Sequence, residues 1–151
     1  MGDPTVHFSG AKLLLFIGDR ILILRRDHSP GIPWPGCLDF PGGGRDGTET
    51  PHACATREAL EEVGLIVTPD QMRLAHLHWR YPKCDWFFAV HLPGTAEAQV
   101  VFGDEGAGWS LMDPARAAND CQMIPHFGAI LAGYLQRIGY EKTGNPKAPG
   151  K

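Results

Sequence analysis

Residues 43–65 read GGRDGTETPHACATREALEEVGL and contain three glutamates, Glu58, Glu61 and Glu62, at i, i+3 and i+4. On a helix this spacing places the three carboxylates on one face. Like charges this close repel one another, at a cost of roughly 0.2–0.5 kcal/mol per pair. A cation among them removes that cost, and Mg²⁺ prefers oxygen ligands. The stretch therefore predicts a metal-binding helix, and metal-assisted chemistry on phosphates is the use that fits it.

The same stretch carries signals for both ends of this helix. Thr50 can accept a hydrogen bond as the N-cap, and Pro51 suits the first helical position. Gly64 suits the left-handed residue just past the C-terminus. We expect three apolar side chains of the helix to pack inward: Ala53, Cys54 and Leu60.

Strands and helices are mixed along the rest of the chain without regular alternation. Apolar, β-prone runs predict a hairpin of strands 11–17 and 20–26, and further strands at 38–40, 73–80, 84–92, 98–102 and 109–111. Prolines at helix-start positions predict a short helix from 114 and a final helix over 125–138. This mixture favours an α+β fold, an α/β/α sandwich around a mixed β-sheet.

The composition is that of one soluble globular domain. We assign residues 1–140 to that domain and residues 141–151, which are polar and rich in Gly, Pro and Lys, to a flexible tail. A formal charge of −3 argues against a general binder of nucleic acids or anionic membranes. No apolar run is long enough to cross a bilayer, and the four cysteines show no zinc spacing, so we expect a cytoplasmic protein with reduced thiols.

The glutamate helix and the loop before it resemble the Nudix box, whose pattern is G-x5-E-x7-R-E-U-x-E-E-x-G-U, where U is a bulky aliphatic residue. Eight of the nine defined positions agree in type and spacing: Gly43, Glu49, Arg57, Glu58, Glu61, Glu62, Gly64 and Leu65. The one departure is Ala59, which is smaller than the usual aliphatic residue and changes no ligand.

This resemblance implies the Nudix fold and a hydrolase of a nucleoside diphosphate linked to another moiety, with Mg²⁺ or Mn²⁺ as cofactor. By this analogy Glu58 and Glu62 are the central metal ligands, and Glu61 is a further ligand or a contact to the attacking water. The carbonyl of Gly42, just before the box, often completes the coordination in the family.

The resemblance also implies supporting roles within the box. Arg57 is placed to pair with Glu49 and to orient the ligand helix. The two glycines of the box pattern, Gly43 and Gly64, support the structure at its two ends.

The general base differs between branches of the family, and one branch takes it from a later loop. The stretch Gly103-Asp104-Glu105-Gly106 is similar to that loop. We therefore expect Glu105 to be an additional metal ligand or the base, with Asp104 as the alternative. The expected catalytic set is Arg57, Glu61, Glu62 and Glu105.

Four residues are candidates to contact the substrate: Arg25, Arg26, Trp34 and Tyr81. Arg25 and Arg26 end a strand that approaches the site in this fold, where one guanidinium can bind a phosphate in bidentate fashion. A solvated strand end explains the two arginines equally well. Trp34 and Tyr81 lie in expected loops and can stack on a base.

Three functions remain open from the residues and the resemblance. The first is a Mg²⁺-dependent nucleotide pyrophosphohydrolase, which is favoured because no acid of the box is lost. The second is a hydrolase of a non-nucleotide diphosphate, and the third is a non-catalytic regulator that binds a nucleotide. The partner is in each case a small molecule, and a homodimer is allowed because dimers are common among relatives.

Overall fold

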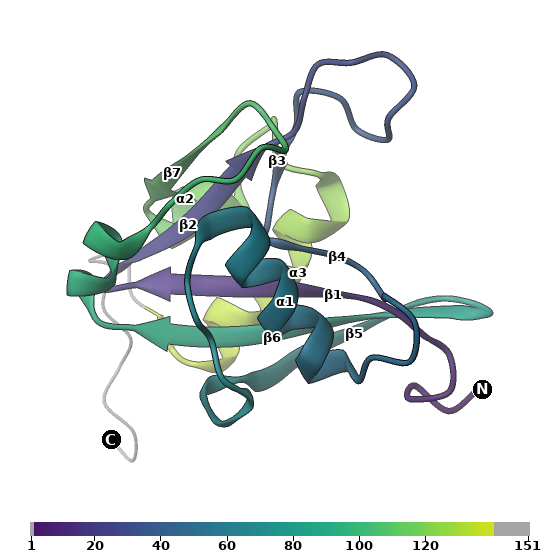
Figure 1. The fold of residues 1–151 in the computed structure, drawn as a ribbon. Coiled ribbons are helices and arrows are strands. Elements are labelled where there is room, and N and C mark those ends of the chain that lie inside the picture. The colour runs from purple at the N-terminus through teal and green to yellow at the C-terminus, as the bar shows by residue number, and fades with distance from the viewer. Residues whose placement is uncertain (1, 141–151) are drawn as a thin grey trace.

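Seven strands form one mixed sheet at the centre of the protein (Figure 1), whose computed structural model describes residues 2–140. The strands are β1 (Phe8–Ile17), β2 (Arg20–Arg25), β3 (Leu38–Asp39), β4 (Gly42–Gly44), β5 (Arg73–Arg80), β6 (Lys83–Leu92) and β7 (Gly108–Met112). They neighbour one another in the order β3-β2-β1-β6-β5, with β4 paired to β1 and β7 to β2. The β1–β6 pair is parallel and the other pairs are antiparallel.

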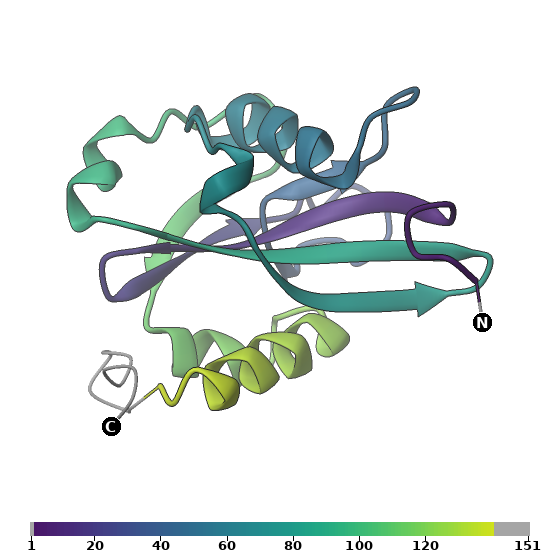
Figure 2. The ribbon, with the colours of Figure 1, turned by 90° about the horizontal axis from the view of Figure 1, so that it is seen from below.

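Helices cover both faces of this sheet (Figure 2). The first, α1 (Pro51–Val63), lies on one face, and α2 (Pro114–Ala118) and α3 (Pro125–Arg137) lie on the other. Two 3₁₀ helices, η1 (Pro69–Gln71) and η2 (Gly94–Gln99), lie in the connections. The three layers confirm the expected α/β/α sandwich. The single-domain assignment stays a prediction, and the tail at 141–151 lies outside the described residues.

Strand β1 shows how side-chain alternation builds a core on each face of the sheet. Leu13, Leu15 and Ile17 pack on the side of α1, whereas Leu14 and Phe16 pack on the side of α3. All five side chains are buried. The strand is apolar on both faces because it lies between two helical layers and pairs in parallel with β6.

Helix α1 rests on the sheet through small side chains. Cys54, Ala55 and Ala59 are fully buried, so a large aliphatic residue at position 59 is not needed for this contact. Cys54 packs inward as expected. The expectation for Ala53 and Leu60 is wrong, because both lie outside the stripe of small residues that touches the sheet and are exposed.

The expected strand at 98–102 is also wrong, because this segment pairs with the end of α1. The N–H of Val101 donates to the carbonyl of Val63 at 2.9 Å, and the N–H of Gly103 donates to the carbonyl of Glu62 at 2.9 Å. The last carbonyls of a helix have no partner within the helix. The segment satisfies two of them, so it follows the helix end instead of a sheet edge.

The other strands and helices are confirmed to within a few residues of their expected bounds. Strand β4 was not expected, because three glycines have a low strand propensity. It forms by pairing with β1, where Gly42 lies opposite Lys12. No helix in the described part of the chain is long and apolar enough to cross a membrane.

Thr50 holds the N-terminus of α1, since its side-chain oxygen accepts a hydrogen bond from the N–H of Ala53 at 3.1 Å. We expect Thr50→Ala to lower the free energy of unfolding in urea by about 1 kcal/mol, because that N–H loses its partner. Thr50→Ser keeps the hydroxyl and should lie within about 0.5 kcal/mol of the wild type. An equal loss of unfolding free energy in both variants would show that the cap oxygen does not provide this stability.

Candidate active site

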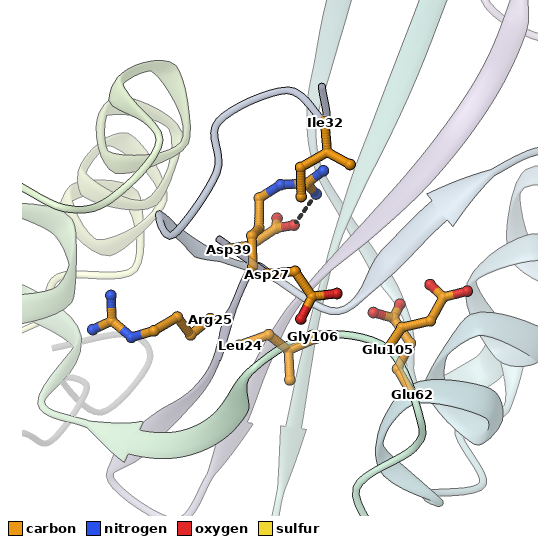
Figure 3. Close-up of a pocket in the computed structure, with 9 residues that line it drawn as sticks. Leu24, Arg25, Asp27, Ile32, Asp39, Glu62, Glu105 and Gly106 are labelled. Carbon is orange, nitrogen blue, oxygen red and sulfur yellow. Dashed lines mark hydrogen bonds and ion pairs between the residues drawn. The ribbon is translucent and has the colours of Figure 1, made fainter. Parts of the chain in front are cut away.

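A cavity of about 270 Å³ opens where the ends of β2 and α1 meet the loop that precedes β7 (Figure 3). We call it the acidic cavity because four of its lining residues are carboxylates. Its lining residues are Leu24, Arg25, Arg26, Asp27, Ile32, Asp39, Glu62, Glu105 and Gly106. Two of the expected site acids, Glu62 on α1 and Glu105 on the later loop, are thus brought into one cavity.

The carboxylate of Glu62 is half-buried and accepts a hydrogen bond from the N–H of Gly42 at 2.7 Å. Burial raises the pKa of Glu62 to about 8. The Gly42 N–H and the Lys12 ammonium oppose this rise, and the neighbouring Glu58 carboxylate adds to it. The site therefore favours neutralisation of Glu62, either by a proton or by a cation.

Gly42 reaches Glu62 because β4 lies very close to β1. Its φ is 138°, and a Cβ at this position would collide with the carbonyl oxygen of Ala11. The carbonyl of Gly42 accepts a hydrogen bond from the Lys12 ammonium at 3.2 Å. Only a glycine therefore fits at this position. Its backbone N–H and C=O both face charged side chains.

Glu105 is positioned by backbone hydrogen bonds on both sides of it. Before it, the N–H of Gly103 donates to the carbonyl of Glu62. After it, the N–H of Ala107 donates to the carbonyl of Arg25 at 2.8 Å. The short loop therefore connects the end of α1 to the end of β2, and it carries Glu105 across the acidic cavity. Asp104, the alternative base, is not among the residues that line this cavity.

Arg57 has the expected ion pair with Glu49, in bidentate geometry. Its Nε and Nη2 donate to the two carboxylate oxygens of Glu49 at 2.7 and 3.0 Å, and Nη2 also donates to the carbonyl of Gly44 at 3.0 Å. These hydrogen bonds raise the pKa of Arg57 and hold the pKa of Glu49 below its ordinary value. The pair therefore ties α1 to the loop that follows β4.

The third nitrogen of Arg57 contacts the other two glutamates of the box. Nη1 donates to Glu58 at 2.9 Å and to Glu61 at 3.1 Å. Neither glutamate lines the acidic cavity. In residues 2–140, no three acidic, histidine or cysteine side chains converge as a ready-made metal cage. The guanidinium offsets part of the repulsion that the i, i+3, i+4 spacing creates.

The two arginines at the end of β2 point in different directions. Arg25 points away from the acids (Figure 3), and its guanidinium donates to the carbonyl of Gly36 at 2.8 Å and to Gln122 at 3.0 Å. Arg26 donates from Nε to the carbonyl of Pro33 at 2.8 Å and from Nη1 to Asp39 at 3.0 Å. Arg26 is thus bound to another residue of the acidic cavity, Asp39, whereas the guanidinium of Arg25 is bound elsewhere.

A second cavity of about 520 Å³ adjoins the first, and the two share Arg26 and Asp39. We call it the basic cavity because four cationic residues line it. Its lining residues are Ser9, Gly10, Ala11, Lys12, Arg26, Pro33, Trp34, Asp39, Gly43, Gly44, Arg80, Lys83, Asp85, Phe87, Ile124, His126 and Phe127. An acidic compartment thus lies beside a compartment with cationic and aromatic walls.

Of the two expected stacking residues, only Trp34 lines one of these cavities. Its ring is 46% exposed and lies 6.4 Å from the ring of His126, measured between centroids. Tyr81 is 69% exposed and packs against His7 with 5.2 Å between ring centroids. Its substrate role stays a prediction, as do those of Arg25 and Arg26.

Several polar residues of these cavities lie outside the expected site, among them Lys12, Asp39 and Asp27. Lys12 on β1 and Asp39 on β3 form an ion pair at 3.1 Å, and Asp39 is only 5% exposed. Their signal was a charged residue inside each of two apolar expected strands. Asp27 faces the acidic cavity from the loop after β2 (Figure 3), and no sequence signal marked it.

Comparisons with known proteins agree with this architecture. A family model described as "NUDIX domain" matches residues 7–130. An Ap4A hydrolase from C. elegans matches with a TM-score of 0.66 at 18% identity over 86% of this chain and 98% of its own. A dihydroneopterin triphosphate pyrophosphohydrolase from E. coli matches with a TM-score of 0.60 at 19% identity over 89% and 97%.

A third solved structure, a MutT/nudix family protein from Enterococcus faecalis, is a longer molecule. It matches with a TM-score of 0.58 at 17% identity over 74% of this chain, which spans only 44% of that protein. At these identities the three structures establish a shared fold.

The Glu49–Arg57 pair predicts a specific pH dependence of stability. The folded pKa of Glu49 lies below its ordinary value of 4.5, so its stabilisation is present above pH 4.5 and is lost as the pH falls through the folded pKa. We expect Glu49→Gln to lower the free energy of unfolding by about 1 kcal/mol at pH 7, measured by urea denaturation. The gap to the wild type should close at acid pH.

Glu97→Gln is the matched control, because Glu97 also pairs with an arginine, Arg20, but both partners are about half exposed. Its effect at pH 7 should be smaller. A Glu49→Gln gap that stays constant down to pH 3 would contradict the assignment.

Proposed function

The chain belongs to the NUDIX domain family, and we propose that it is a Mg²⁺-dependent hydrolase that cleaves the diphosphate bond of a nucleoside diphosphate linked to another moiety. The observation that carries this proposal is the meeting of Glu62 and Glu105 in one cavity, where burial makes the charged form of Glu62 unfavourable unless it is neutralised. A divalent cation provides that neutralisation, and a diphosphate brings the charge that the cation then offsets.

The donor set of the site suits a hard cation. Glu62 and Glu105 offer carboxylate oxygens, and the carbonyl of Gly42, the residue whose N–H binds Glu62, is a further oxygen donor. Glu58 and Glu61 become available when they leave Arg57, whose hydrogen bonds to Glu49 and Gly44 do not depend on them. When bound, a divalent cation there would neutralise the diphosphate and lower the pKa of a bound water.

The protein's own residues supply positioning and proton transfer. Glu105, held on the cavity wall by its two backbone anchors, is the proposed acceptor of the proton from the attacking water, or a further ligand. Arg26 is the proposed phosphate contact. Two of its nitrogens are used by Pro33 and Asp39, and Nη2 makes no hydrogen bond to any described residue. Arg57 orients α1 through Glu49.

The basic cavity is the proposed place for the part of the substrate beyond the scissile diphosphate. It shares Arg26 with the acidic cavity, so one molecule can extend across the boundary. Trp34 offers an exposed aromatic surface there for a base. The solved structures named for Ap4A and dihydroneopterin triphosphate hydrolysis suggest phosphorylated molecules with an aromatic ring system as the first compounds to assay.

Glu62→Gln should lower kcat at least about 100-fold, because the buried anionic ligand is lost, with the fold unchanged by circular dichroism. The assay measures turnover, with Mg²⁺, of a panel of compounds that each contain a diphosphate linkage: Ap4A, dihydroneopterin triphosphate, ADP-ribose, a deoxynucleoside triphosphate and a non-nucleotide diphosphate. Glu97→Gln, the same substitution at an exposed acid away from both cavities, should retain full activity. Tight nucleotide binding with no turnover of any compound would remove the hydrolase proposal and leave a binding protein.

Mg²⁺ itself should stabilise the folded protein, because the native state binds it and the unfolded chain does not. Without substrate, the melting temperature of the wild type and of Glu97→Gln should rise as Mg²⁺ is added and return when a chelator removes it. Glu62→Gln should show a much weaker rise. The same rise in all three proteins would mean that the cation binds elsewhere.

A further inference from the structure

Two cations, Arg80 and Lys83, stand directly opposite each other at the turn between β5 and β6. They are the last register pair of this antiparallel hairpin, and both line the basic cavity. Like charges directly opposite each other on neighbouring strands destabilise a sheet. The pair therefore needs either a compensating charge within the protein or a role that uses two cations together.

Asp85 compensates only one of the two cations. Arg80 donates from Nε and Nη2 to a single oxygen of Asp85, Oδ2, at 3.0 and 2.8 Å. The other oxygen, Oδ1, accepts a hydrogen bond from the hydroxyl of Ser9 at 3.0 Å. Within residues 2–140, no acidic side chain forms an ion pair with Lys83. The end of the basic cavity thus keeps a net positive charge.

The strand register places this charge away from the acidic cavity. Lys12, which pairs with Asp39 at the boundary of the two cavities, lies beside Phe87 of β6. Lys83 lies four residues further along β6, which is roughly 13 Å at the usual rise per residue. The turn that carries Arg80 and Lys83 thus lies at a different level of the sheet from the boundary of the two cavities, and neither residue lines the acidic cavity. The aromatic ring of Trp34 also lines this cavity.

We propose that Arg80 and Lys83 form a second phosphate site, which selects substrates whose aromatic half carries a phosphate outside the scissile diphosphate. An added phosphate monoester brings close to two negative charges, which the Lys83 ammonium and the Nη1 of Arg80 can bind together while Asp85 stays paired to the other nitrogens of Arg80. This inference rests on the proposed function, because it takes the basic cavity as the place of the substrate's aromatic half. It narrows the substrate class to nucleotides with an additional phosphate on the nucleoside.

The test uses two pairs of compounds that differ only in that phosphate: NADP⁺ with NAD⁺, and coenzyme A with its dephospho form. Binding is measured by titration calorimetry in a chelator, so that no hydrolysis occurs. In at least one pair the wild type should bind the phosphorylated member more tightly. Lys83→Ala should weaken the binding of the phosphorylated compound about fivefold and leave the affinity for the compound without that phosphate unchanged. Lys83→Arg, which keeps the charge, should retain the preference.

Arg73→Ala removes an exposed cation from the opposite end of β5 and should leave all affinities unchanged. Lys83 is exposed at the start of β6, and a melting temperature near that of the wild type confirms that its variants are folded. Equal binding within both pairs, or a preference that survives in Lys83→Ala, would falsify the second phosphate site.

Turnover with Mg²⁺ is measured separately on the same compounds, so the two proposals fail in different ways. A preference that depends on Lys83, without turnover of these compounds or of the panel above, supports the phosphate site and removes the hydrolase. Turnover without any preference overturns the phosphate site and leaves the hydrolase in place.

Discussion

The hydrogen bond from the Gly42 N–H to the Glu62 carboxylate joins the sheet to the helix that carries the acids. A carboxylate that is taken out of water must recover hydrogen bonds, and here the backbone of β4 supplies one. That N–H is available only because Gly42, without a Cβ, lies against the carbonyl of Ala11. The small stripe of Cys54, Ala55 and Ala59 brings α1 onto the sheet close enough for the contact to form.

The acidic cavity depends on a second constraint: the last carbonyls of α1 need hydrogen-bond partners. A helix leaves its last carbonyls without internal partners, and here Val101 and Gly103 satisfy two of them. The chain then returns to the end of β2 through the hydrogen bond of Ala107. Glu105 lies between these two anchors, so its position relative to Glu62 follows from backbone hydrogen bonds.

Charge is divided between two adjoining cavities. Lys12 and Arg26 both bind Asp39, which is nearly inaccessible to solvent and forms part of the wall that the cavities share. On one side of this wall the lining is rich in carboxylates, and on the other it is rich in cations and aromatic rings. This arrangement is suited to a molecule whose diphosphate lies near the wall and whose larger half lies in the basic cavity.

Features that depend on a few neighbouring residues were predictable from the sequence. The bounds of α1 follow from Thr50, Pro51 and Gly64, and the structure has the cap hydrogen bond and a left-handed Gly64. Most strands also appear where apolar runs predicted them. The prediction of a strand at 98–102 was wrong because the hydrogen-bond partner of this segment, the end of α1, lies far away in the sequence.

The family, the layered fold and the spacing of the glutamates follow from local sequence, because the box is a local pattern and helical geometry converts spacing into a shared face. Which of those acids line a cavity depends on how distant segments pack. Glu62 does so beside Glu105, whereas Glu58 and Glu61 bind Arg57 and do not line that cavity. The tertiary structure also places Arg80 opposite Lys83 beside Trp34. These arrangements depend on packing and strand register between distant segments, which no local pattern contains.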